Sequence, residues 1–405
     1  MDLMPILSTL RRHKTAAGLI VVEIALTLAI VCNALHLIAT RLQVLQTDTG
    51  LAESELVVLD LDGTVADERA DDVSAQDLQA LRALPGVKSV ALTNQVVYGY
   101  NSNNSSVSLE QGQRQGRLSA ANYSGGEGLI ATLGLKLVEG RDFRPEEYLL
   151  GSVLSKQDKR TVGQVIVNRA LAQRLWPGEP AVGKVIYVID DTPSTVVGVL
   201  EQLPHPYPGR KTDSGDLAML FPVKPSYRGG VYLLRTEPGQ RDAVLKAAVE
   251  ATARIDPTRV VGTGATLQEM RARHFAQDRS MVWLLSGVIV ALMVVTAFGI
   301  VGLASFWVQQ RTRMIGTRRA LGATRAQIRR YFQLENFMLT SSGIAIGMAG
   351  ALALSLWLMR LYELPRLPLV WLPVGALALW LLGQAAVLAP ARRAAALPPV
   401  AALRA

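Results

Sequence analysis

The stretch MVWLLSGVIVALMVVTAFGIVGLASFWVQQRTRMIGTRRALGATRAQIRR, Met281 to Arg330, joins a long apolar run to a segment rich in arginine. Residues 281–308 carry no charged side chain and exceed the roughly 20 apolar residues that cross a bilayer core. They therefore predict a membrane-spanning helix. The segment after them is basic and has no acidic residue, which is typical of a loop on the cytoplasmic side of a membrane.

Three more apolar runs have the length of membrane spans, residues 16–40, 335–361 and 370–389. Of the 405 residues, 50% are hydrophobic, more than a soluble protein of this size usually carries. The first run is longer than the apolar core of a signal peptide and no convincing cleavage site follows it. The sequence thus predicts an α-helical membrane protein with four transmembrane helices and an inserted α/β (α+β) domain.

The basic residues set the expected orientation. They precede the first span, fill the segment 309–334 and follow the last span, whereas the short loop 362–369 is poor in them. The flanking basic residues are Arg11, Arg12, Lys14, Arg392, Arg393 and Arg404. By the positive-inside rule, the termini (1–15 and 390–405) and the loop 309–334 are cytoplasmic, and residues 41–280 are outside. A multi-pass protein of a bacterial inner membrane with a large periplasmic domain is the simplest setting.

The pattern of residues 41–280 is mixed α/β. ELVVLDL predicts a strand that ends at Asp60, followed by a turn at Asp62 and Gly63. Ser74 is expected to cap a helix that stops at Pro85. A hairpin turn is expected over 190–193. The charged stretch TLQEMRARHFAQDRS, 266–280, predicts a stalk helix that runs unbroken into the span 281–308.

VVLDLDGTVAD, Val57 to Asp67, raises the alternative of a membrane-tethered phosphatase. In haloacid-dehalogenase-type phosphatases, which this short stretch resembles, one aspartate attacks phosphorus and a second handles the proton and magnesium. Asp60 and Asp62 would take those roles, with Thr93 and the pair Asp190 and Asp191 as further motifs. A lysine motif is missing, because Lys184 lies too close to Asp190 for an intervening helix. The simpler interpretation is a strand and a turn.

Other catalytic and cofactor sites find little support. The chain has one cysteine, Cys32, so neither an internal disulfide nor a cysteine-based metal site can form. Its four histidines are scattered and form no His-Glu-x-x-His pattern. No phosphate-binding Gly-x-x-x-x-Gly-Lys-Ser/Thr loop is present. We expect no metal site, no cofactor and no catalytic residue in this chain.

Several residues within the spans point to helix packing. Gly343, Gly347 and Gly350 recur at three- and four-residue spacing, which lets helices approach closely in lipid. Glu23 is an acidic residue inside the first span, where such a residue suggests a functional site. The plainer alternative is that its side chain reaches the membrane interface or pairs with another helix. Asn33 and His36 are expected to make interhelical or interfacial hydrogen bonds, with lining of a substrate route as the alternative.

The segment QQRTRMIGTRRALGATRAQIRRYFQLENFML, Gln309 to Leu339, resembles the signature R-x-x-E-I-G-x-x-R-A-x-G-A-x-x-x-x-I of MacB/FtsX-type ABC transporter permeases. LGLKLVEGRDF and VIVNRALAQRLWPGEPAVGKVIYV resemble the periplasmic core domain of that family, and PARRAAALPPVAALRA resembles its C-terminal tail. The matching residues of the signature are Arg311, Ile315, Gly316, Arg319, Ala320, Gly322, Ala323, Ile328 and Glu335. The chain departs from it at Met314, where the family usually has Glu, which puts one polar contact to the ATPase in doubt.

The resemblance implies that residues 309–334 are a loop that docks on an ATPase, with Arg313 and Leu321 in the same loop. A plain lipid-facing basic helix is the alternative that charge alone would favour. The implied partners are a separate ABC ATPase that binds ATP and magnesium, a second permease chain, identical or related, and membrane lipid. An exporter would add a periplasmic adaptor and an outer-membrane duct. Nucleic acid is not an expected partner.

The resemblance implies a non-catalytic subunit that transmits ATP-driven motion to its periplasmic domain, for efflux or export. Within the same class, lipoprotein extraction and control of a cell-wall hydrolase remain open. A sensor permease that reports an antimicrobial peptide is another alternative. The sequence does not name the substrate.

Overall fold

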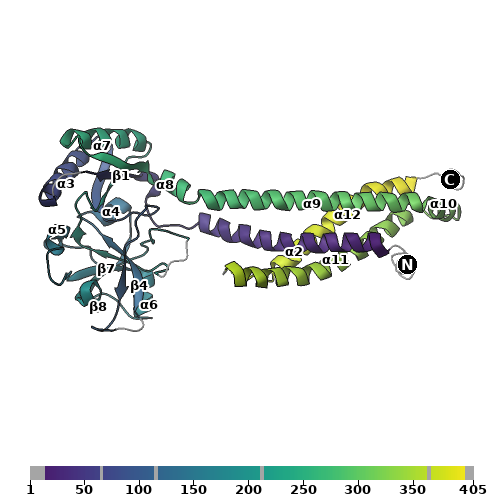
Figure 1. The fold of residues 1–405 in the computed structure, drawn as a ribbon, viewed down its shortest axis with the longest axis horizontal. Helices are drawn as coiled ribbons and strands as arrows, with labels where there is room; N and C mark the ends of the chain where they lie inside the picture. Colours follow the sequence, from purple (N-terminus) through teal and green to yellow (C-terminus); the bar gives the residue numbers. More distant parts are fainter. Residues whose placement is uncertain (1–13, 64–66, 114–116, 210–213, 363–365, 397–405) are drawn as a thin grey trace. The chain divides into compact units, whose positions relative to one another are not determined.

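The computed structural model describes residues 14–63, 67–113, 117–209, 214–362 and 366–396. The chain divides into two compact units, which are described separately below (Figure 1). The helical unit comprises Met1–Gln43 and Gln277–Ala405, and the α/β unit comprises Val44–Ala276. Arg11, Arg12, Arg404 and the expected tail after residue 396 lie outside the described residues.

The first sheet of the α/β unit has the strand order β13-β1-β12-β2 and is antiparallel throughout. Its strands are β1 (Leu56–Asp62), β2 (Val87–Thr93), β12 (Val231–Thr236) and β13 (Val260–Thr266). Helices α3 (Asp67–Arg82) and α7 (Arg241–Ile255) pack on one face, over Val57, Leu59 and Leu61. The alternate residues of β1 face the other way, because successive side chains of a strand point to opposite faces.

The second sheet has the order β3-β4-β10-β7-β9-β5, with β8 beside β9. Its strands are β3 (Asn104–Val107), β4 (Leu118–Ser124), β5 (Leu137–Gly140), β7 (Gln164–Asn168), β8 (Val185–Tyr187), β9 (Pro193–Leu200) and β10 (Ala218–Phe221). A separate pair joins β6 (Leu149–Leu150) to β11 (Val223–Lys224). The short helices are η1 (Glu53–Glu55), α4 (Leu129–Leu133), η2 (Pro145–Glu147), α5 (Gly151–Leu154), α6 (Arg169–Leu175), η3 (Ile189–Asp191) and α8 (Leu267–His274).

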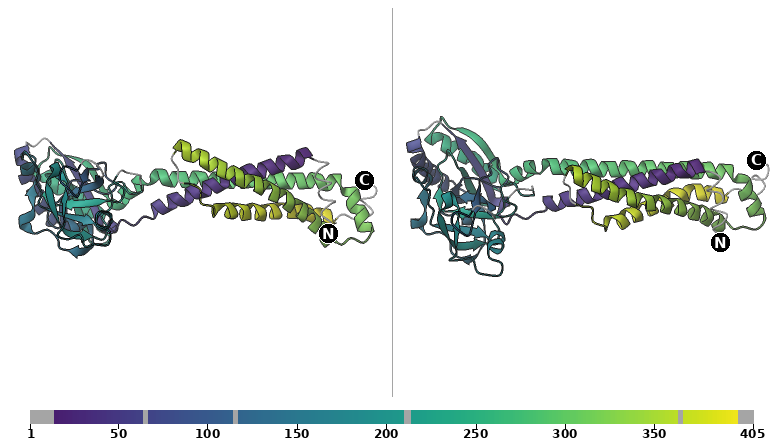
Figure 2. Two further views of the ribbon diagram at one scale, coloured as in Figure 1. Left: turned by 90° about the horizontal axis from the view of Figure 1, so that it is seen from below. Right: turned by 60° about the horizontal axis from the view of Figure 1, so that its bottom comes forward.

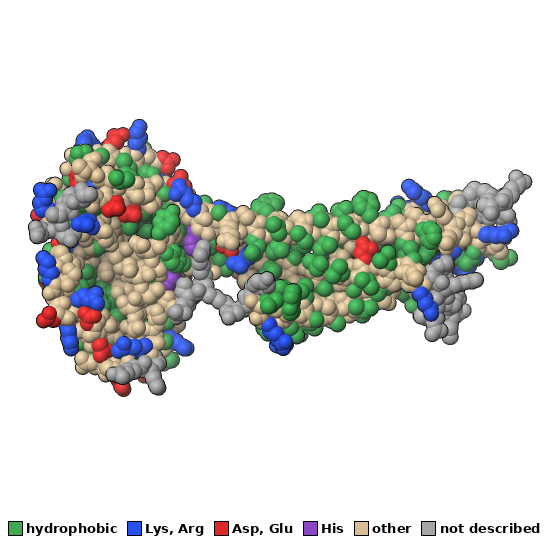
Figure 3. Space-filling model, in the orientation of Figure 1, with side chains coloured by type: hydrophobic (Ala, Val, Ile, Leu, Met, Phe, Trp, Pro, Cys, Tyr) green, Lys and Arg blue, Asp and Glu red, His purple; other side chains and the backbone are tan. Residues whose placement is uncertain are grey.

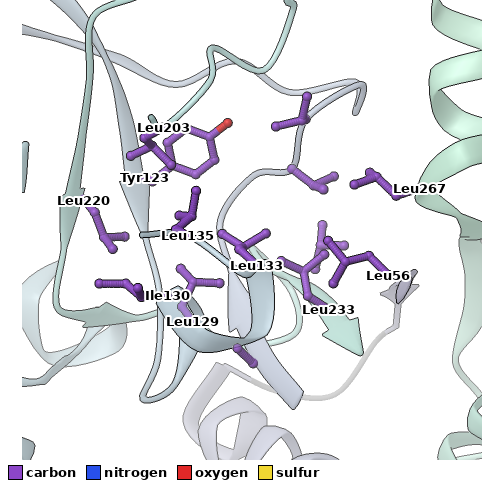
Figure 4. Close-up of a cluster of buried hydrophobic side chains, with 14 of the residues drawn as sticks. Leu56, Tyr123, Leu129, Ile130, Leu133, Leu135, Leu203, Leu220, Leu233 and Leu267 are labelled. Carbon is purple, nitrogen blue, oxygen red and sulfur yellow. The ribbon is translucent and has the colours of Figure 1, made fainter. Parts of the chain in front are cut away.

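An apolar core joins the two sheets. Figure 4 shows Leu56 and Leu233 from the first sheet and Leu220 from the second, with Leu133 of α4 between them. Each of these side chains is buried. Removing so much apolar surface from water is the main force that holds the two sheets together.

Among the described residues of the helical unit, four helices are long and apolar enough to cross a membrane, which confirms the predicted fold class. They are α2 (Lys14–Leu45), α9 (Ala276–Gln310), α11 (Arg325–Tyr362) and α12 (Trp371–Ala396), and the short α10 (Thr312–Ala320) connects α9 to α11. Figure 2 shows the four long helices running alongside one another. Apolar side chains cover much of the helical unit in Figure 3, as expected of a lipid-facing surface.

Helix α2 contacts all three of its long neighbours. A Cβ on Gly347 of α11 would lie 2.8 Å from the carbonyl oxygen of Ala25, and one on Gly375 of α12 would lie 2.5 Å from Cys32 Sγ. Thr27 and Thr296 of α9 share a hydrogen bond of 2.9 Å between their hydroxyls. Small residues on the neighbours therefore let α2 pack tightly within the bundle.

Three sequence-based expectations are wrong in detail. Ser74 lies in the middle of α3, buried, and its hydroxyl donates to the Ala70 carbonyl. β1 continues to Asp62, so Asp60 lies within the strand. The stalk helix does not run unbroken into the span, since α8 ends at His274 and α9 begins at Ala276. Phe275 separates the two helices, and its side chain is buried in the core between the sheets.

Candidate coupling site at the α9–α10–α11 elbow

The short helix α10, its connections to α9 and α11, and the turn 321–324 form a compact structure that we call the elbow. Arg311 lies between α9 and α10. Its N–H donates to the Trp307 carbonyl at 3.0 Å, and its own carbonyl accepts from Ile315 N–H at 2.9 Å. Backbone hydrogen bonds therefore continue through the junction, so α10 is braced against the end of α9.

A buried ion pair ties the start of the elbow to α11. Arg311 Nη1 donates to both carboxylate oxygens of Glu335, at 2.9 and 2.8 Å. The two side chains are 9% and 1% exposed. The Arg311 guanidinium also lies 5.3 Å from the centre of the Trp307 ring, within range of a cation–π interaction. The opposite charges compensate each other in this buried pair, although Arg311 Nη2 has no hydrogen-bond partner among the described residues.

An apolar cluster forms the inside of the elbow. Ile315, Ile328 and Phe332 are 1%, 4% and 3% exposed and pack with residues from the end of α12. The α12 members are Ala391, Ala394 and Ala395. Gly316 is buried beside Ile315. The elbow is therefore packed on its inner face by α11 and α12 rather than being a loose loop.

The turn after α10 is closed by backbone geometry. Gly322 has φ +95°, a left-handed conformation that favours glycine. Ala323 N–H donates to Arg318 O at 3.0 Å and Gly322 N–H to Arg319 O at 3.1 Å, the pair of bonds that defines a Schellman motif. Thr324 and Gln327 then cap α11 reciprocally, as a capping box does.

The closed turn presents one large apolar side chain outward. Leu321 is 83% exposed, and Arg313, Met314, Ala320 and Gly322 are exposed with it. Ala323 and Arg319 are half-buried, and Arg319 Nη1 donates to the Ala395 carbonyl at 3.3 Å. The motif residues thus separate into an inner set that holds the elbow and an outer set that faces away from the chain.

Sequence reasoning missed several residues that shape the elbow. Trp307 contacts Arg311, and the Arg318 guanidinium lies 5.0 Å from the centre of the Tyr331 ring. The Thr-x-x-Gln pattern of Thr324 and Gln327 could have been found, because it is a recognised N-terminal signal of a helix. The alanines of α12 carried no such signal.

The glycines and Glu23 lie within the helical unit. A Cβ on Gly343 would meet Ile24 Cβ at 2.8 Å, while one on Gly350 would meet Ala29 Cβ only at 3.6 Å. Glu23 of α2 lies opposite Gly299 of α9, where a Cβ would lie 2.5 Å from a carboxylate oxygen. Asn33 Nδ2 donates to Ala29 O and to Ala351 O of α11, an interhelical hydrogen bond.

The aspartates of the phosphatase alternative do not converge. Asp60 lies in the first sheet, whereas Asp190 and Asp191 lie beside β8 in the second, paired with Arg160 and Arg117. Moreover, the sheet that holds Asp60 is antiparallel. Among the described residues, no group of three or more His, Cys, Asp or Glu side chains could hold a metal ion. The aspartates of the phosphatase alternative therefore do not form one site.

Comparison with known protein families identifies the class. A model of the FtsX-like permease C-terminal region matches residues 286–399, and a model of the MacB-like periplasmic core domain matches residues 24–278. The chain belongs to the MacB/FtsX-type ABC transporter permeases, as the elbow motif predicted. It is a multi-pass membrane protein with an extracellular domain of the periplasmic type.

Its relatives are distant in sequence. The macrolide export ATP-binding/permease protein MacB 1/2 of Paracoccus denitrificans is 27% identical over 98% of this chain, which spans 58% of that protein's length. The uncharacterized ABC transporter permease YknZ of Bacillus subtilis is 26% identical over 81% of this chain and 78% of its own length. The crystal structure of the periplasmic region of MacB from Actinobacillus actinomycetemcomitans covers 57% of this chain and 97% of its own, at 13% identity and a TM-score of 0.35.

Proposed function

We propose that this permease works with a separate ATPase subunit and that the elbow is the element on which the ATPase docks. The observation that carries the proposal is Leu321, 83% exposed at the tip of a turn that is fixed by backbone hydrogen bonds. A single exposed leucine is ordinary on a protein surface. Here, however, it stands on a rigid support among arginines, an arrangement that suits insertion into a partner's pocket.

The inner set of elbow residues supplies the rigidity that coupling needs. A push on Leu321 reaches α11 through the Arg311–Glu335 ion pair and α12 through Ile315 and its apolar neighbours. The ATPase can shift the permease only by contacting two of its conformations differently. We infer that nucleotide-driven movement of the ATPase tilts the elbow and that the helices carry the movement to the α/β unit.

The positive-inside rule supports the orientation that this mechanism requires. The elbow is rich in arginine and therefore belongs on the cytoplasmic side, with both termini, in a bacterial inner membrane. The α/β unit then lies in the periplasm. ATP and magnesium are bound by the partner, and YknZ, which matches over most of its length, is named as a permease.

Pairing with a second permease chain, identical or related, completes the proposed assembly. Helix α2 exposes Leu19, Val22 and Leu26 along the same stretch as Glu23. A carboxylate in the membrane is costly in lipid, and a facing chain would remove it from contact with hydrocarbon. Efflux or export of a substrate on the periplasmic side is the proposed activity, in line with the macrolide export proteins among the relatives.

Capture of the ATPase tests the docking role. The tagged permease is purified from detergent-solubilised membranes, and a bound ATPase is identified by mass spectrometry and by ATP hydrolysis. We expect Leu321→Asp to reduce capture about tenfold or more, as loss of a central apolar contact does. Leu109→Asp, at an exposed leucine of the α/β unit, is the matched control and should capture normally. Absence of any ABC ATPase in every nucleotide state would overturn the proposal.

A further inference from the structure

The α/β unit contains a cleft where the core between its sheets opens to solvent. Two adjoining cavities of about 400 and about 30 Å³ share Gly99, Tyr100, Thr263 and Met270. The larger one lies beside α8, at Arg273 and His274. The smaller one reaches the first sheet at Val58 and Asp60. The combined space is within the range that small organic ligands occupy in proteins.

Asp60 breaks the apolar pattern of β1 at this cleft. Leu56 and Val58 face the core between the sheets and are 0% and 1% exposed. Asp60 is the next residue on the same face, because side chains alternate along a strand. It pairs with Thr263 of β13, which also lines both cavities. The apolar side chains Leu56 and Val58 of β1 are thus followed, on the same face, by the carboxylate of Asp60 at the cleft.

The Asp60 carboxylate is partly withdrawn from water without gaining a partner among the described residues. Within the described parts of the chain, no hydrogen bond or ion pair reaches its oxygens. Burial raises the pKa of Asp60, and the nearby negative charge of Asp62 raises it further. Placing a carboxylate here disfavours its charged form unless a cation is supplied. Strand packing alone gives no reason for an acid at this position.

Aromatic side chains line the rest of the cleft and are held in place. Tyr207 stacks on the His274 ring, with centroids 6.3 Å apart and ring planes 5° apart. Its hydroxyl donates to the Tyr100 carbonyl at 2.5 Å. Tyr98 donates to a Glu53 carboxylate oxygen at 2.9 Å. Tyr100 is 82% exposed and thus available to a ligand. Such rings offer apolar surface and also attract ammonium groups.

We propose that this cleft binds an amine-bearing molecule with an apolar or aromatic body. The ammonium group pairs with Asp60 at the inner end, and the body packs against Tyr100, Tyr207 and Met270. Arg273 is exposed at the outer end of the cleft. Its positive charge repels the ammonium group there, so the ligand binds with its ammonium group at the inner end. The cleft is a ligand site in its own right; its role as the site of a transported substrate rests on the proposed function.

Dansylcadaverine is a suitable probe, because it joins an aromatic fluorophore to a primary amine through a flexible chain. Its N-acetyl derivative keeps the body and lacks the charge. Binding is measured by fluorescence anisotropy on the full chain in lipid nanodiscs, with empty nanodiscs subtracted. We expect saturable binding of the amine and about tenfold weaker binding of the acetylated probe, the change that one lost charge-assisted contact produces.

Variants then place the site. Asp60→Asn should reduce the affinity for the amine to that for the acetylated probe, and Tyr100→Ala should weaken both probes. Glu250→Gln is the matched control, since this exposed acid lies on α7, over the opposite face of the sheet. Equal affinity of wild type for both probes would overturn the proposal, even if Asp60→Asn failed to fold. So would undiminished amine binding by Asp60→Asn. Failure of ATPase capture would leave the binding result unchanged, so the two proposals fail separately.

Discussion

Arg311 and Glu335 show how single residues can hold the elbow. Their side chains are buried, so removing either one leaves an uncompensated charge. We expect Arg311→Met and Glu335→Gln each to destabilise the helical unit by about 3–5 kcal/mol, and the double variant to lose less than the sum. Thermal unfolding of the purified protein, followed by tryptophan fluorescence, measures all three. Strictly additive losses would show that the pair does not interact.

We expect His205 to make the α/β unit sensitive to mild acid. Burial lowers its pKa, only partly opposed by Asp216, and its Nδ1 accepts a hydrogen bond of 3.0 Å from Tyr207 N–H. The unfolded chain therefore binds a proton more readily, with a pKa of about 6.5. The stability that neutral His205 contributes is present above that value and is lost as pH falls through the lower folded pKa.

We therefore expect the unfolding temperature of the α/β unit to fall between about pH 7 and about pH 5. His205→Gln should flatten this dependence, because glutamine does not titrate in that range. His274→Gln serves as the comparison on the same aromatic cluster. A wild-type profile no steeper than that of His205→Gln would contradict the assignment.

At the scale of elements, α2 and α11 pack through glycine. A Cβ on Gly347 would fall 2.8 Å from a backbone oxygen of α2, which cannot move aside as a side chain can. We expect Gly347→Val to destabilise the bundle by about 1–3 kcal/mol through overpacking. Gly302→Val in α9 is the matched control, because none of the described residues that could obstruct its Cβ comes within 4 Å of that position. Unfolding in increasing SDS measures the stability of both variants. An equal loss of stability in the two would refute the packing role of Gly347.

The elements differ in how far sequence could predict them. The long helices were predictable because a bilayer demands about 20 apolar residues in a row, a signal that needs no partner. A glycine such as Gly322, which has φ +95°, is likewise a local signal of a turn. By contrast, α3 begins at Asp67, before Ser74, within a stretch in which charged residues outnumber apolar ones. Phe275 interrupts the stalk helix, and its burial depends on core residues distant in the chain.

The two candidate sites were predictable to different degrees for the same reason. The elbow residues are close in sequence and carry a family motif, although the pairing of Arg311 with Glu335 across 24 positions became visible only in the structure. The cleft is assembled from β1, β12, β13, α8 and two loops. Asp60 attracted attention in the sequence as part of a phosphatase motif, but Asp190 and Asp191 lie beside the other sheet, and Asp60 lines a cavity with Tyr100 and Thr263.

For the whole molecule, the proposed mechanism depends on the elbow and the α/β unit facing opposite sides of the membrane. Cys32 is the single cysteine and is 0% exposed. The wild type should therefore react little with thiol reagents. Leu109 and Leu321 are exposed positions in the α/β unit and the elbow. Each can be changed to cysteine without opening a core.

We expect a membrane-impermeant maleimide to label Leu109→Cys in intact spheroplasts, because the positive-inside rule puts residues 41–280 outside. Leu321→Cys should be labelled only after the membrane is permeabilised, since the proposed topology puts the arginine-rich elbow on the cytoplasmic side. The wild type controls for reaction at Cys32, and labelling of both variants after permeabilisation confirms that both thiols are accessible. Labelling of Leu321→Cys in intact spheroplasts would invert the topology, and an ATPase in the cytoplasm could then not reach the elbow.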